Sequence, residues 1–141
     1  SSTHAASAAT QKRYETVQKS SLQVDECRSK FSLFSSPTFG DKANPMSIKT
    51  DATLGTIMIG NNDKAFKLTL NTGIIQSYAN EKWNTITYVT DQKGFLGTLK
   101  DMYAFVNQAL ELAQDKGSSF QVKQATCASK MLEFTEKEHQ I

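Results

Sequence analysis

Arginine is scarce in this chain of 141 residues, and its scarcity argues against binding to nucleic acid. Only Arg13 and Arg28 among the 16 basic residues are arginine, and the 14 acidic residues leave a net charge of +2. Arginine is the side chain that recognises phosphate and guanine in a bidentate geometry. A nucleic-acid footprint also needs clustered positive charge. We therefore expect no nucleic-acid partner.

Histidine is equally rare, and both copies, His4 and His139, lie near the ends of the chain. A catalytic histidine needs a nucleophile or a carboxylate held within hydrogen-bond reach, and chain ends rarely provide that geometry. No Cys-x-x-Cys pair accompanies the histidines, so a zinc ligand set is missing. The run at 60–63 resembles a calcium loop in composition only. We therefore expect that the protein is not an enzyme and that it has no cofactor and no metal site.

The sequence has no apolar run near the ~18 residues that a membrane span requires. It starts at Ser1 rather than Met, after which the residues are small and weakly ordering. We expect residues 1–9 to be a flexible tail or linker remnant and residues 10–141 to form a single α+β domain. The missing Met leaves open a signal peptide, a membrane anchor upstream of Ser1, or a cloning choice.

The chain has two cysteines, Cys27 and Cys127, one toward each end of the domain. Two buried free thiols would satisfy the sequence, but an even number of cysteines placed this way favours a disulfide in an exported domain. Such a bridge would close a loop over most of the domain. The lost chain entropy of that loop corresponds to roughly 4–5 kcal/mol.

Residues 94–116 carry the strongest structural pattern, a long amphipathic helix. Thr90 or Asp91 can cap its start, and Gly117 can adopt the left-handed conformation that ends it. The apolar positions recur every three or four residues, which places them on one stripe. They are Phe95, Leu96, Leu99, Met102, Tyr103, Val106, Ala109, Leu110 and Ala113.

A second helical pattern covers about residues 10–34, with Cys27 on its apolar stripe. The proline-containing segment 35–45 is expected to be a loop. Next come about four short segments that alternate apolar and polar residues between Asn, Asp and Gly turns, which is typical of an antiparallel meander with one buried face. These predicted strands are 53–59, 64–70, 74–78 and 83–90.

Residues 120–126 and 131–135 also alternate, and we expect two C-terminal strands there. The predicted fold is α+β. It has an N-terminal helix, an antiparallel β-meander of about four strands, a long amphipathic helix packed on the sheet and two C-terminal strands.

Four aromatic residues are candidates for contact with a partner. Trp83 stands beside charged residues at the start of a strand, where it could be exposed, although it could also pack under helix 94–116. Phe31, Phe34 and Phe39 flank the proline loop and form a second candidate patch.

These observations favour a non-enzymatic, exported protein–protein interaction domain, such as the soluble part of an envelope, secretion or pilus-type assembly. Its partners would be other proteins or further copies of itself. The absence of an Asn-x-Ser/Thr sequon fits a bacterial or phage source, and the cysteine pair fits a periplasmic, cell-surface or secreted location. The alternatives are a carrier of a small apolar ligand between helix and sheet, and a compact inhibitor or immunity protein acting through loop 35–45.

Overall fold

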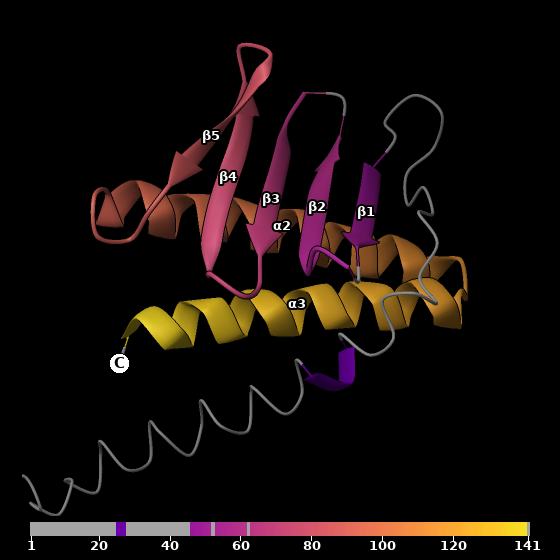
Figure 1. The fold of residues 1–141 in the computed structure, drawn as a ribbon. Coiled ribbons are helices and arrows are strands. Elements are labelled where there is room, and N and C mark those ends of the chain that lie inside the picture. Colours follow the sequence, from indigo (N-terminus) through magenta and orange to yellow (C-terminus); the bar gives the residue numbers. More distant parts are fainter. Residues whose placement is uncertain (1–24, 28–45, 52, 62, 141) are drawn as a thin grey trace, which may run out of the picture.

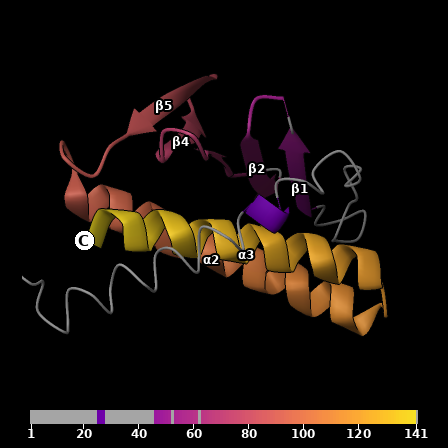
Figure 2. The same ribbon diagram turned by 60° about the horizontal axis from the view of Figure 1, so that its bottom comes forward.

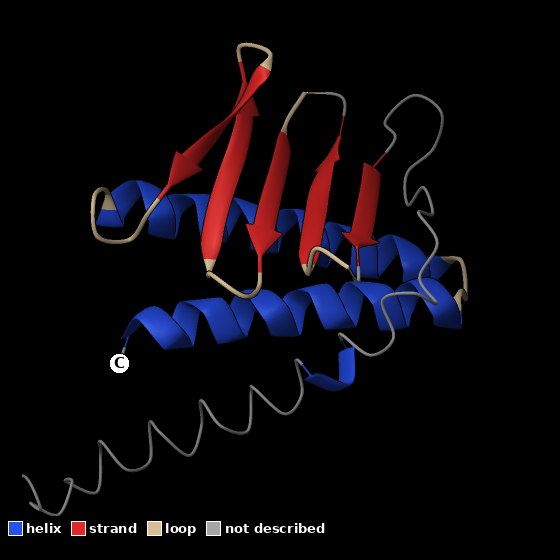
Figure 3. Cartoon of the chain, in the orientation of Figure 1, coloured by secondary structure: helices blue, strands red, loops and turns tan. Residues whose placement is uncertain are grey.

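The computed structural model describes residues 25–27, 46–51, 53–61 and 63–140 of the protein. Residues 25–27 are helical, and a five-stranded antiparallel sheet and two long helices follow. Both long helices lie on the same side of the sheet and run across its strands (Figures 1 and 3). The elements are β1 (Met46–Asp51), β2 (Thr56–Asn61), β3 (Ala65–Thr69), β4 (Ile74–Ala79), β5 (Lys82–Ile86), α2 (Gln92–Asp115) and α3 (Ser119–Gln140).

The α+β class and the antiparallel meander are confirmed, but the sheet has five strands and not about four. Each strand pairs with the next one along the chain, in the order β1-β2-β3-β4-β5. The additional strand is β1, which starts directly after Pro45. Its alternation rests on only Met46 and Ile48, which is why it did not stand out. Most of the predicted N-terminal helix at 10–34 and the loop at 35–45 lie outside the described residues.

The long helix is confirmed as α2, with the predicted signals at both ends. The Asp91 carboxylate accepts a hydrogen bond from the Gly94 N–H at 3.0 Å, which caps the first turn. At the other end Gly117 has φ +69°. The Gly117 and Ser118 N–H groups donate to carbonyls in the last turn of α2, both at 3.0 Å. These two bonds form a Schellman motif, which ends the helix and turns the chain toward α3.

The prediction of two C-terminal strands is wrong, because residues 119–140 form the single helix α3. Its buried positions fall at helical spacing, but several carry the small or polar residues Gln124, Ala125 and Ala128, so the stripe is inconspicuous. Two strands would also need a turn between them. The sequence between them, residues 127–130, has no Gly, Pro, Asn or Asp, and Ser129 is its single turn-forming residue.

The core lies between the inner face of the sheet and the two helices, as the turned view in Figure 2 shows. Alternate strand residues point inward and meet the stripes of α2 and α3. Burial of such apolar side chains is the main stabilising term, at about 1.5–3 kcal/mol for each large residue. The largest fully buried side chains are Ile48, Ile57, Ile59, Leu68, Ile75, Phe95, Leu99, Met102, Met131 and Leu132.

One polar side chain is part of this core. Gln124 on α3 is 1% exposed, and its Nε2 donates to the Ile48 carbonyl on β1 at 3.0 Å. This hydrogen bond joins the helix directly to the sheet. At the other end of α3, the ring of His139 approaches the β3–β4 turn so closely that a Cβ on Gly73 would lie 3.2 Å from its Cε1 atom.

Two glycines should respond to alanine in opposite directions. A Cβ on Gly60 would lie 2.5 Å from the Lys64 carbonyl oxygen, so Gly60→Ala forces a backbone shift in the β2–β3 turn. Gly97 is exposed on α2, and a Cβ there has no neighbour within 4 Å. We expect Gly60→Ala to lower the free energy of unfolding by about 1–3 kcal/mol. Gly97→Ala should raise it by about 0.5–1 kcal/mol.

Urea denaturation of both glycine variants beside the wild-type protein measures these changes. Gly97→Ala is the matched control, because it adds the same methyl group at an unobstructed site. A Gly60→Ala variant as stable as the wild type would contradict the described turn.

Candidate functional site

The sheet face opposite the two helices is the candidate site. Ile57, Leu68 and Ile75 point toward the helices and are fully buried, so the residues before and after them in each strand point the other way. In the described part of the chain, no helix or strand lies over this second face (Figures 1 and 2). We call it the open face. It is made by Ser47, Lys49, Asp51, Thr56, Met58, Gly60, Ala65, Lys67, Thr69, Ile74, Gln76, Tyr78, Trp83 and Thr85.

An aromatic cluster with a lysine lies at the β4–β5 end of the open face. Tyr78 and Trp83 are directly opposite each other across the strand pair. Their ring centroids are 5.2 Å apart in an edge-on arrangement. Lys67 reaches over β4 from β3 and places its Nζ 4.4 Å from the Trp83 centroid. Cation–π contacts of this kind contribute about 0.5–1 kcal/mol at exposed sites. Tyr78 remains 46% exposed.

The β4–β5 hairpin fixes the position of this cluster. Its two loop residues, Asn80 and Glu81, have φ +55° and +64°, as a type I′ turn requires. The turn sets the register that puts Tyr78 opposite Trp83. Farther from the turn, Gln76 and Thr85 are also opposite each other across the strand pair. The Gln76 Nε2 donates to the Thr85 hydroxyl oxygen at 3.3 Å. The hairpin therefore presents an ordered set of aromatic and polar groups.

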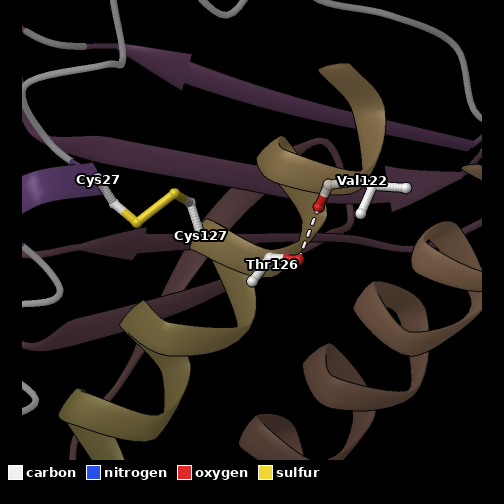
Figure 4. The surroundings of a disulfide bond; sticks show 4 residues. All are labelled: Cys27, Val122, Thr126 and Cys127. Carbon is white, nitrogen blue, oxygen red and sulfur yellow. Dashed lines mark hydrogen bonds between the residues drawn. A yellow bond between two sulfur atoms is a disulfide. The ribbon is translucent and has the colours of Figure 1, made fainter. Parts of the chain in front are cut away.

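The Cys27–Cys127 disulfide is present, which confirms that prediction. The two Cα atoms are 5.5 Å apart, and the residues are 3% and 8% exposed. The bond joins helical residues 25–27 to α3 (Figure 4). Next to Cys127 in α3, the Thr126 hydroxyl donates a 2.7 Å hydrogen bond to the Val122 carbonyl, one turn earlier in the helix. A buried disulfide of this kind is typical of proteins from oxidising compartments.

His139 packs against aromatic rings at the end of the core. Its centroid is 4.8 Å from that of Phe95 and 5.3 Å from that of Tyr88. Its Nδ1 lies 2.8 Å from the carbonyl oxygen of Thr135, one turn earlier in α3. These contacts give His139 a structural role in closing the core between α3 and the start of α2.

Tyr103 is the described residue whose acidity the fold changes clearly. Burial raises the pKa of the Tyr103 hydroxyl, and the nearby negative charge of Glu136, which also shares a hydrogen bond with it, raises this pKa further. The tyrosine therefore stays neutral and acts as a donor between α2 and α3. We assign it to the helix pair and not to a reactive site.

A shallow hollow of about 280 Å³ lies on the flank of α2, beside the β2–β3 turn. Lys64 of the β2–β3 turn forms one side of the hollow, and side chains of α2 form the other. Its lining combines one cation, one carboxylate and one aromatic ring. The lining residues are Lys64, Asp101, Ala104, Phe105 and Gln108.

Of the predicted contact residues, Trp83 is on the open face, half-buried, and does not pack under α2. Phe31, Phe34 and Phe39 lie outside the described residues. Sequence reasoning missed Tyr78 and Lys67. The available signal for Tyr78 was the turn at Asn80 and Glu81, because a two-residue turn there places Tyr78 opposite Trp83. The signal for Lys67 was its place between Phe66 and Leu68, which both point into the core.

Comparisons with known protein families, characterised proteins and solved structures find no match to this chain. Neither long helix has an apolar stretch sufficient to cross a membrane, and this finding covers the described residues. The same part of the chain contains no group of three or more His, Cys, Asp or Glu side chains placed to hold a metal ion.

Proposed function

We propose that this protein is a non-enzymatic, exported interaction domain that binds a protein partner through the open face of its sheet. The observation that carries the proposal is the cluster of Tyr78, Trp83 and Lys67 on a sheet face that no described element covers. Both long helices pack on the opposite face to form the core, so among the described elements the open face has no packing role.

Tyrosine and tryptophan are the residues that most often dominate binding energy in protein interfaces. They offer large, stiff contact areas with a polar tip. Trp83 is held by Tyr78 and Lys67 in the free protein, so binding would cost little side-chain entropy. Around the cluster, Met58 and Ile74 add apolar surface, and the open-face hydroxyl and amide groups can form hydrogen bonds.

The disulfide supports export to an oxidising compartment, such as the periplasm, the cell surface or the medium. In that setting an interaction domain would serve as the soluble part of an envelope, secretion or pilus-type assembly. The carrier alternative stays a prediction, and so does the inhibitor alternative, because loop 35–45 lies outside the described residues.

A random dodecapeptide library displayed on phage, selected against the immobilised wild-type protein, tests the proposed function. We expect peptides whose binding is lost with Trp83→Ala and weakened at least about tenfold with Tyr78→Ser, as for a hot-spot residue worth about 1.4 kcal/mol or more. Lys100→Ala, on the exposed side of α2, is the control and should bind normally. Peptides that bind all three variants equally would contradict the proposal.

A further inference from the structure

We infer that the occupant of the open face is an acidic, extended segment of a partner protein. The inference rests on the proposed function and adds the chemistry of the partner. Three properties of the open face lead to it: its charge, the state of Lys67 and its size.

The open face is positively charged in its middle. Lys49 and Lys67 lie in the same cross-strand row, with Met58 between them. The one described carboxylate on the face, Asp51, is at the end of β1, and its Oδ1 already accepts a hydrogen bond from the Leu54 N–H at 2.9 Å. A complementary partner therefore brings negative charge to the centre of the face.

Lys67 is held ready for a carboxylate. Its ammonium stays over the Trp83 ring, and it forms no ion pair with another described residue. The ring occupies one side of the ammonium and cannot accept all three of its N–H groups. An arriving carboxylate can take the remaining donors without displacing the lysine from the ring.

The size of the face suits an extended segment. Five strands spaced about 4.8 Å apart and about six residues long, at 3.3 Å per residue, give the face a flat footprint of roughly 500 Å², enough for a short extended chain laid along the row of lysines. Two copies packed face to face would bring Lys49 and Lys67 of both chains together. Like charges across an interface oppose that arrangement.

Nucleic acid fits these observations less well. The open face has two lysines and no arginine, whereas phosphate backbones are bound by larger clusters of positive charge. A short run of Asp or Glu with interspersed apolar residues matches two lysines, Met58 and the aromatic pair. We therefore assign the face to an acidic peptide segment.

The test uses synthetic copies of the library-selected dodecapeptides and measures their affinity by isothermal titration calorimetry. We expect the selected sequences to be enriched in Asp and Glu and to bind more weakly as salt increases. Lys67→Glu should weaken binding at least about tenfold, and Lys67→Arg should stay within about threefold of wild type. Lys49→Glu provides a second variant, away from the aromatic cluster. Lys100→Glu controls for the change in net charge.

The outcomes separate the inference from the proposed function. Neutral or basic peptides that need Tyr78 but ignore Lys67→Glu would overturn the acidic partner and leave the open face as a binding surface. Peptides insensitive to Tyr78, Trp83 and Lys67 together would overturn both. Tighter binding of a 15-nucleotide oligothymidylate than of the acidic peptides would overturn the inference in favour of nucleic acid. A dimer in sedimentation that Lys67→Glu alters would overturn it in favour of a second copy.

Discussion

Replacing either cysteine of the Cys27–Cys127 pair by serine is expected to destabilise the protein by up to about 4–5 kcal/mol. The bond joins residues 100 positions apart, so it closes a loop over most of the chain and removes much conformational freedom from the unfolded state. Because domains of this size are stable by only about 5–15 kcal/mol in total, such a loss removes a large part of the stability.

A double-mutant cycle gives this prediction its sharpest form. A bond requires both sulfurs, so Cys27→Ser, Cys127→Ser and the double variant should all lose a similar free energy of unfolding in urea titrations. Independent buried thiols would instead give losses that add in the double variant. Wild-type protein unfolded with and without a reducing agent provides the control, since reduction should reproduce the effect of the single variants.

Phe95→Ala is expected to lower the free energy of unfolding by about 3–5 kcal/mol. The substitution opens a cavity where α2, the β5–α2 connection and the end of α3 meet. Phe95 is 0% exposed at the start of α2. Its ring is in edge-on contact with Tyr88 at 5.7 Å between centroids and packs against His139 at 4.8 Å. The substitution therefore removes buried area, the ring contact with Tyr88 in the β5–α2 connection, and the ring contact with His139 that links α2 to the end of α3.

Phe120→Ala is the matched control for Phe95→Ala, since the same atoms are removed from a side chain that is 38% exposed at the start of α3. We expect its free energy of unfolding to change much less than that of Phe95→Ala. Equal losses for the two variants in thermal or urea unfolding would show that the described core is wrong at this end of the molecule.

The sequence predicted the parts of the fold whose signals are local and redundant. Helix α2 has a complete apolar stripe, an Asp91 cap and a terminal Gly117, so three independent signals agree. The strands β2 to β5 combine alternation with turn residues. The disulfide was favoured because Cys27 lies on an apolar stripe and the number of cysteines is even. The helix and strand predictions depend on residues close together in the chain, and the disulfide prediction depends on there being only one possible pairing.

Helix α3 was missed because its buried side is made partly of small and polar residues. Ala125 and Ala128 contribute little to an apolar pattern. A glutamine such as Gln124 is expected at the surface, but its side chain is buried and donates to the Ile48 carbonyl on β1. Its burial becomes understandable only once β1 is beside α3. The absence of Gly, Pro, Asn and Asp after position 119 was the available local signal.

The sequence predicted one residue of the candidate site but not the arrangement around it, which depends on contacts between strands. Trp83 was identified as a contact residue, but the sequence allowed it to lie on either face of the sheet. The register of β4 and β5 decides this, because it places Trp83 beside Tyr78 on the face away from α2. Lys67 is two strands away from Trp83, so their contact is a tertiary feature that alternation alone does not reveal.

Fluorescence of Trp83 gives the most direct measurement of the central claim that the open face binds a partner. Trp83 is the only tryptophan in the chain, so its emission reports on this surface without interference. The measurement is acrylamide quenching of the protein alone and with a saturating selected peptide that lacks tryptophan. The account predicts that the peptide shields Trp83, so quenching falls toward that of a buried indole. Unchanged quenching, at a peptide concentration that calorimetry shows to be saturating, would contradict it.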